Sequence, residues 1–344
     1  MTAVRHVARR VLGTPGIVLV ALLTLIALPF VAVLQLFSVL GYLVGRPPRF
    51  RALRVATFAV LYSVGECACL LACAALWLRA PVPSRRDLAA WERRHVRLLQ
   101  ALLGSLLRGA EALFRFRLRL VSPRGESLDH DRPLVVLGRH AGPGASFVLV
   151  HVLLRHFGRV PRIVLKRRLR LDPALDVLLT RIGCAFLGGS GATETVTRLA
   201  AQLQGRDALL IYPEGSDWTP TRHRMAVRRL RLRGLRARAN AAAARPHVLP
   251  PHPGGTFAAL TAAPQAQLAV FMHTGHDELL EAGALWHALP LRRELLMVWW
   301  NEERPEVTDE AGCGRWLDEV WDDIHAWVSE QQPIVETGPT PQSS

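Results

Sequence analysis

The fold is decided by residues 134–157, which read LVVLGRHAGPGASFVLVHVLLRHF. Four consecutive apolar residues, Leu134–Leu137, predict a buried strand, and the glycines after it predict a turn. Ser146–Phe157 is mostly apolar and contains neither Gly nor Pro, which predicts a helix. A buried strand, a glycine-rich turn and a helix form the unit from which parallel sheets are built.

The same alternation continues on both sides of this unit. It predicts an α/β fold with a mixed, mostly parallel sheet flanked by helices, in which ligands gather at the carboxyl ends of the strands. Further strands are expected at Phe114–Leu120, Arg162–Leu165, Cys184–Leu187, Ala208–Tyr212, His247–Leu249, Leu268–Met272 and Leu295–Trp300, and further helices at Asp87–Leu113, Pro173–Ile182, Thr193–Leu203, Thr221–Ala244, Thr256–Leu260 and Cys313–Val328.

The N-terminal part is continuously apolar. No residue from Val11 to Gly45 is charged, and Val55–Leu78 carries a single charge, Glu66. Each run is long enough to cross a bilayer, for which about 20 apolar residues suffice. The short connection at 46–51 predicts a hydrophobic helical hairpin, which either crosses the membrane twice or enters one leaflet. We therefore expect a membrane-anchoring hairpin at 1–82, an α/β domain at 83–330 and a disordered tail at 331–344.

The charge balance indicates an anionic partner. Among 344 residues, 43 Lys and Arg stand against 28 Asp and Glu, which gives a net charge of +15. Such a chain suits a phospholipid surface, a phosphorylated substrate or a nucleic acid. Because 50% of the residues are hydrophobic, the chain does not belong to the disordered class. The five cysteines form no Cys-x-x-Cys pair, which argues against a zinc ribbon or a thioredoxin-like site.

Two predicted strands end in residues that suit chemistry at the sheet edge. His140 follows the first strand in a turn with three glycines, where an imidazole is able to act as a general base near neutral pH. Glu214 and Gly215 follow a second strand, where a carboxylate and backbone N–H groups are able to hold the hydroxyls or phosphate of a polar substrate. Each pattern alone is also that of an ordinary loop. Their common place at carboxyl strand ends predicts a shared site.

Four sequence blocks follow one another in order. They are His140 with Gly142-Pro143-Gly144, then Gly183-Cys184-Ala185-Phe186-Leu187, then Tyr212-Pro213-Glu214-Gly215, and last Val248-Leu249-Pro250-Pro251. In this order the blocks resemble those of the glycerolipid acyltransferases, in particular the 1-acyl-sn-glycerol-3-phosphate acyltransferase family. The resemblance covers residues 133–260 and implies a membrane-bound enzyme of phospholipid biosynthesis at the cell membrane, with its catalytic domain facing the cytoplasm.

The resemblance also implies a reaction. His140 would remove the proton from a hydroxyl of a lysophospholipid such as 1-acyl-glycerol-3-phosphate, and that oxygen would attack the thioester carbonyl of acyl-CoA or an acyl carrier protein. No metal or tightly held cofactor is expected, since the thioester carrier is a co-substrate. The expected substrate-binding residues are Arg139, Gly142, Lys166, Glu214 and Gly215.

Two positions depart from the pattern of the resembled family. The aspartate that orients the histidine there falls at Ala145, and the arginine of the second block falls at Gly189. Asp217 comes just past the Pro-Glu-Gly turn, on the correct sheet edge, and we predict that it is the second catalytic residue beside His140. The alternative is a catalytically silent relative that binds lipid or acyl carriers at the membrane.

The expected helix at Thr221–Ala244 contains eight arginines and no acidic residue. Three interpretations apply: a surface for lipid headgroups or CoA phosphates, a nucleic-acid surface, or a solvated helix face. A nucleic-acid surface is expected to interleave aromatic side chains with the charges, and this stretch has none. The first prediction is therefore a lipid surface, with the solvated face second, and no nucleic-acid partner is expected.

Overall fold

The computed structural model describes residues 50–79, 88–123, 125–141, 144–187, 191–275, 277 and 282–331, together with scattered positions between 22 and 40. Most of the first arm of the predicted hairpin lies outside these ranges, as do Gly142, Gly189 and the predicted tail from residue 332 onward. The described ranges contain a seven-stranded sheet and helices on both of its faces.

The centre of the fold is this sheet, with the strand order β1-β7-β6-β2-β5-β3-β4. Five neighbouring strands, β6, β2, β5, β3 and β4, run parallel to one another, whereas β7 is antiparallel to β6 and β1 is parallel to β7. The prediction of an α/β fold with a mixed, mostly parallel sheet is therefore confirmed. The strands are β1 Leu118–Val121, β2 Leu134–Gly138, β3 Val160–Lys166, β4 Ala185–Leu187, β5 Asp207–Ile211, β6 Gln267–Thr274 and β7 Leu295–Glu302.

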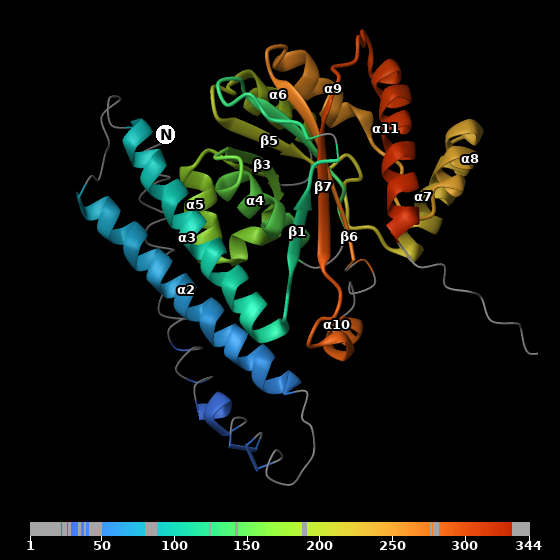
Figure 1. Ribbon diagram of the computed structural model, residues 1–344. Helices are drawn as coiled ribbons and strands as arrows, with labels where there is room; N and C mark the ends of the chain where they lie inside the picture. Colours follow the sequence, from blue (N-terminus) through green and yellow to red (C-terminus); the bar gives the residue numbers. More distant parts are fainter. Residues whose placement is uncertain are drawn as a thin grey trace, which may run out of the picture.

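Helices cover both faces of the sheet because successive side chains of a strand point to opposite faces (Figure 1). In β2, Leu134 and Val136 belong to one hydrophobic core, and Val135 and Leu137 belong to the other. The first core is closed by α3 (Leu88–Phe114), α4 (Ala145–Arg155) and α5 (Pro173–Arg181), and the second by α6 (Ala192–Ala201), α9 (Pro253–Ala262) and α11 (Glu310–Gln331).

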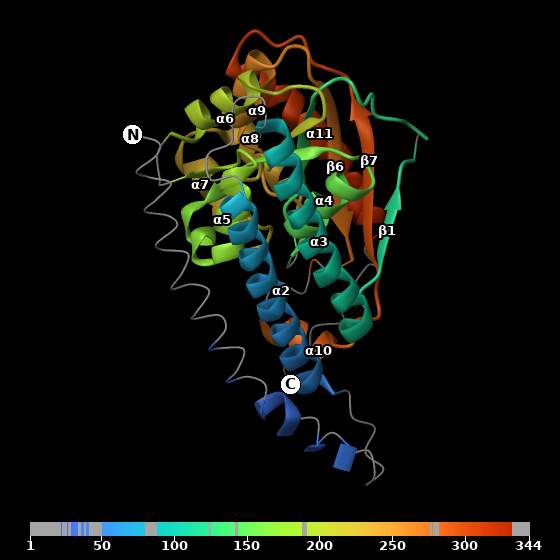
Figure 2. The same ribbon diagram turned by 90° about the vertical axis from the view of Figure 1, so that its left-hand side faces the viewer.

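In the described part of the chain, one helix, α2 (Arg51–Arg79), is long and apolar enough to cross a membrane. It packs against α3 and α5, on the outside of the domain (Figure 2). Arg51 donates hydrogen bonds to the backbone oxygens of Leu289, at 3.1 Å, and His287, at 2.8 Å. Near the middle of α2, Glu66 accepts a hydrogen bond from the backbone N–H of Ala174 at 3.1 Å. The helix is thus tied to the α/β domain at its start and at its centre.

Three predicted elements differ from the observed ones. The basic segment forms two helices, α7 (Pro220–Leu232) and α8 (Arg236–Ala244), because the chain turns at Gly234 with φ +75°, a conformation that glycine adopts without strain. The strand predicted at His247–Leu249 is absent, although its apolar residues are buried. Val248 packs into the second hydrophobic core, and Leu249 packs with Ala141 and Trp218, but the segment pairs with no strand. The strand predicted from Phe114 begins only at Leu118, because α3 continues to Phe114.

Candidate active site at the carboxyl edge of the sheet

The register of the parallel strands brings three predicted site segments to one edge. Val136 of β2 lies level with Leu210 of β5, which in turn lies level with Ile163 of β3. The three strands run in the same direction, so the residues that follow them emerge at the same edge of the sheet. This edge therefore carries the loop after β2, the Pro-Glu-Gly turn after β5 and the end of β3.

His140 and Asp217 meet at this edge. The Nδ1 atom of His140 lies 2.8 Å from Oδ1 of Asp217, and both side chains are partly exposed, at 22% and 29%. The close contact with His140 is the main cause that lowers the pKa of Asp217 below its ordinary value, and Arg222 acts in the same direction. Asp217 therefore stays ionised beside Nδ1. Nε2 is the ring nitrogen that Asp217 does not contact.

Three contacts fix His140, two through its backbone and one through its ring. Its N–H donates to Oε2 of Glu214 at 3.0 Å, and its carbonyl accepts from the N–H of Trp218 at 2.7 Å. Its ring packs against Tyr212, with the ring centroids 4.6 Å apart. Gly138 makes this contact possible, because a Cβ atom at that position would lie 2.7 Å from the Tyr212 ring. The imidazole is thus held in place before any substrate arrives.

Glu214 is a structural link between loops. Its side chain is buried, and Oε1 accepts hydrogen bonds from the N–H of Leu249 at 3.1 Å and from Nε1 of Trp321 at 3.3 Å. Burial is the main cause that raises the pKa of Glu214. Because protein N–H groups occupy both oxygens, the role predicted for Glu214, holding the acceptor, does not fit this geometry.

Gly215 closes the turn after β5. It has φ +69°, and its N–H donates to the carbonyl of Tyr212 at 2.9 Å. The positive φ explains why glycine occupies this position. Its N–H is already bonded to Tyr212 inside the turn, so the Gly215 N–H does not serve the predicted contact with a substrate.

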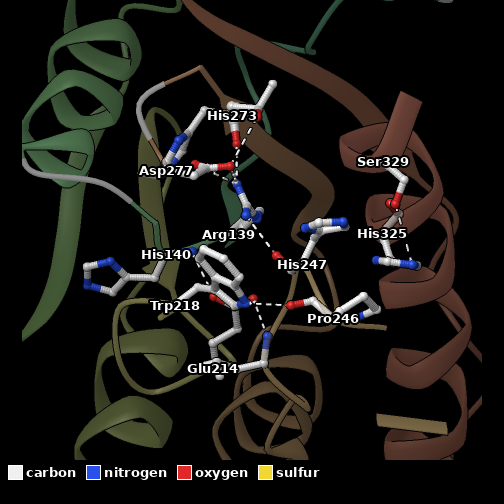
Figure 3. A network of polar contacts seen from close by, with 12 residues as sticks. Arg139, His140, Glu214, Trp218, Pro246, His247, His273, Asp277, His325 and Ser329 are labelled. Carbon is white, nitrogen blue, oxygen red and sulfur yellow. Dashed lines mark hydrogen bonds and ion pairs between the residues drawn. The ribbon is translucent and has the colours of Figure 1, made fainter. Parts of the chain in front are cut away.

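Arg139 points away from the edge, into the interior. It is 1% exposed, and Nη1 contacts both carboxylate oxygens of Asp277, at 3.0 and 3.1 Å, and the carbonyl of His273, at 2.6 Å. Nη2 donates to the carbonyl of His247 at 2.8 Å. Figure 3 shows the His140 ring turned away from this network. The predicted phosphate contact of Arg139 therefore does not fit, because its guanidinium is enclosed by protein acceptors.

Lys166 ends β3 and is exposed at the same edge as His140. One strand, β5, lies between β3 and β2, which places the two strands about 10 Å apart. This distance suits a cation that binds a substrate phosphate while a hydroxyl of the substrate lies at the imidazole. Gly142, the remaining predicted binding residue, lies outside the described ranges.

Three residues of this edge escaped the sequence analysis: Trp218, Asp277 and Trp321. Trp218 stands next to Asp217 in the sequence, and this adjacency was the available signal. Asp277 and Trp321 reach Arg139 and Glu214 from distant parts of the chain, for which the sequence holds no local signal. Within the ranges that the structure describes, no group of three or more His, Cys, Asp or Glu side chains is arranged to hold a metal ion.

The fold is shared with a solved structure. The chain matches the crystal structure of the 1-acyl-sn-glycerophosphate acyltransferase PlsC from Thermotoga maritima with a TM-score of 0.51 and 10% sequence identity. The match covers 81% of this chain and 97% of that chain. No family model and no curated protein sequence matches this chain. At this identity the comparison establishes the common fold, and the predicted resemblance to the glycerolipid acyltransferases is confirmed at that level.

Proposed function

We propose that this protein is a membrane-associated acyltransferase of phospholipid biosynthesis, which transfers a fatty acyl group from acyl-CoA or an acyl carrier protein to a hydroxyl of a lysophospholipid such as 1-acyl-glycerol-3-phosphate. The observation that carries the proposal is the contact between His140 and Asp217, on a fold shared with a lysophosphatidate acyltransferase. The contact supplies the oriented imidazole that the reaction needs, although the family's aspartate position is occupied by Ala145.

The geometry suits general-base catalysis. In this proposal Asp217, whose Oδ1 lies 2.8 Å from Nδ1 of His140, is the hydrogen-bond partner of the Nδ1 proton, so that Nε2 is the basic nitrogen. Nε2 takes the proton from the acceptor hydroxyl as its oxygen attacks the thioester carbonyl. The C–S bond then breaks, and the proton passes from the imidazolium to the leaving thiolate. Asp217 stabilises the imidazolium between these two steps, in the way that a carboxylate supports the histidine of a serine protease.

Charge on the same edge supports a phosphorylated acceptor. Lys166 is exposed at the end of β3, and Arg222 lies beside Asp217, with Nη1 at 2.9 Å from its carbonyl and 3.6 Å from Oδ2. In this proposal Lys166 binds the acceptor phosphate. The apolar helix α2 and the net positive charge favour attachment to the cell membrane, with the α/β domain in the cytoplasm.

The test measures acyl transfer to lysophosphatidate by the purified full-length protein. His140→Ala is expected to lower kcat/KM by about 10² to 10⁴, the usual contribution of a general base. Asp217→Asn keeps the shape but loses the charge, and it is expected to lower kcat by at least about 10². Asp131→Asn, at an exposed position on the opposite edge, is the matched control and keeps wild-type activity.

The same assay separates the enzyme from the silent relative. Ala145→Asp introduces a carboxylate at the family's position in the first turn of α4. Because Asp217 already occupies Nδ1 of His140, this variant is expected to bring no gain. An inactive wild type combined with an active Ala145→Asp variant would refute the proposed activity of this chain.

A further inference from the structure

Helices α7 and α8 form a basic surface with apolar side chains that point outward. We infer that this α7–α8 surface, defined as residues 220–244, binds an anionic phospholipid membrane by its arginines and inserts Leu232 and its apolar neighbours between the headgroups. The inference shares with the proposed function only the presence of a membrane, because it involves neither His140 nor Asp217. Four observations carry it.

The first observation is unpaired charge. Residues 220–244 contain eight arginines and no acidic residue. Arg222 lies near Asp217, and Arg238 lies 3.3 Å from Asp318. The others are exposed, and none of them forms an ion pair with a residue in the described ranges; they are Arg224, Arg228, Arg229, Arg231, Arg233 and Arg236. Six unpaired guanidinium groups on one helical pair attract a surface of negative charge.

The second observation is the position of the apolar side chains. Met225, Leu232 and Leu235 are 48%, 77% and 42% exposed. On α7, His223 and Val227 face the domain and are buried. Met225 stands two residues from both of them, which turns it about 200° around the helix axis, directly outward. Leu232 is seven residues further on, about two helical turns, so it shares the outward face with Met225.

The third observation is the surrounding sheet edge. Leu171 ends the 3₁₀ helix η1 (Arg167–Leu171) that follows β3, and it is 86% exposed. Phe147 lies in the first turn of α4, after β2, and is 42% exposed. Both belong to elements that begin at the carboxyl edge of the sheet, as α7 does. Exposed apolar side chains are thus not confined to α7 and α8, and a lipid surface is able to accommodate several separate apolar contacts, unlike one compact protein partner.

The fourth observation is the place of this surface in the molecule. Figure 1 shows α7 and α8 beside α11, across the sheet from α2 and α3. The surface is therefore separate from the apolar helix α2. Its first turn contains Arg222, which contacts Asp217, so the surface begins at the candidate active site. A membrane bound here would bring lipid headgroups to the edge where the acceptor has to enter.

The experiment follows a fluorescent label at the centre of the surface. Leu232→Cys is labelled with nitrobenzoxadiazole in full-length protein in which the half-buried Cys67 is changed to Ser. The control label is placed at Gln202→Cys, an exposed position at the end of α6. Each protein is reconstituted into vesicles of phosphatidylcholine, with or without phosphatidylglycerol. We expect a blue shift of the label at 232, but not at 202, when phosphatidylglycerol is present.

Two matched sets of charge variants test whether the arginines of the α7–α8 surface cause the binding. Arg228→Gln, Arg229→Gln and Arg231→Gln together are expected to shift the equilibrium away from the inserted label by about 100-fold, since each arginine contributes about fivefold near an anionic surface. The control removes the same charge from the edge strand region, by Arg115→Gln, Arg117→Gln and Arg119→Gln, and keeps the blue shift.

Three results would overturn the inference. They are an absent blue shift with phosphatidylglycerol, an equal loss in both charge variants, and a shift that appears only when an acidic carrier protein is added, which would assign the surface to the acyl donor. His140→Ala is expected to keep the blue shift while it loses acyl transfer. An inactive wild type that still shows the shift would refute the proposed function and leave this inference standing.

Discussion

Arg139 and His140 are neighbours in the chain, but their side chains lie in two different regions, one in the interior and one at the rim of the sheet. Arg139 is enclosed by Asp277 and the backbone oxygens of His273 and His247, whereas His140 faces the partly exposed Asp217. The first region is an interior network that holds the loops together. The second is a partly exposed pair at the rim of the sheet.

Charged side chains therefore have two different roles at the end of β2, one in the interior and one at the rim. In the interior, each charged group is matched by protein donors or acceptors, and its removal leaves a partner unpaired in a poorly solvated place. At the rim, solvent screens the charges, so their removal costs little stability and, under the proposed function, lowers the rate. Interior variants should therefore change the free energy of unfolding, and rim variants should change the rate.

The largest stability effect is expected at Arg139. Arg139→Met removes the buried cation that pairs with Asp277, and the free energy of unfolding is expected to fall by about 3–5 kcal/mol. Denaturant unfolding followed by tryptophan fluorescence measures it. The double variant with Asp277→Leu should regain part of the loss, whereas the exposed Arg119→Met should change little. If Arg139→Met were as stable as the wild type, the interior network would not differ from the rim in its effect on stability.

The next effect is a dependence of stability on pH. Burial, with a smaller contribution from Arg139, lowers the pKa of His273 to about 4. Between pH 6.5 and pH 4 the unfolded chain therefore takes up a proton that the folded protein excludes, so stability falls as the pH falls, by at most about 3 kcal/mol. The measurement compares unfolding curves at pH 7 and pH 4. His273→Gln should reduce this pH dependence, and His130→Gln, at an exposed position, should not.

A smaller loss is expected at Glu214. Glu214→Gln replaces one acceptor oxygen with an amide group, so at least one of the N–H groups of His140, Leu249 or Trp321 loses its partner. We expect a loss of about 1–3 kcal/mol in the free energy of unfolding. Glu319→Gln, an exposed change on α11, is the matched control. An unchanged stability would mean that the three loops are held together without the Glu214 carboxylate.

The smallest stability effects are expected at the rim. His140→Ala and Asp217→Asn should each change the free energy of unfolding by less than about 1 kcal/mol, because both side chains are partly exposed. The same unfolding curves provide the measurement. A loss as large as that of Arg139→Met would assign the pair to the structural network and would explain a loss of activity without catalysis.

Much of the fold could be predicted from apolar patterns. The buried strands at 134–138 and 207–211 are marked by continuous apolar runs, and the helices between them by their length. The break between α7 and α8 was missed because one glycine, Gly234, interrupts a long helix pattern. The strand at His247–Leu249 was predicted from the apolar residues Val248 and Leu249, which are buried here in a segment that is not a strand.

The site was harder to predict because its roles depend on contacts distant in sequence. In the sequence, the turn that contains His140 and the turn that contains Glu214 are both polar segments that follow a predicted strand. Only the folded chain shows that Glu214 is turned inward, toward Trp321, and that Asp217 is turned toward His140. The nearness of Asp217 to His140 could be predicted from its place after β5, next to β2, although the inward direction of Arg139 could not.

The carboxylate beside His140 is delivered by a loop that follows a different strand. A histidine at a sheet edge can therefore recruit its orienting group from any neighbouring connection, and the one-dimensional spacing of the two residues is free to drift over evolutionary time. Scanning genomes for a fixed His-to-Asp interval would pass over chains of this type. Comparing where side chains converge in three dimensions would recover them.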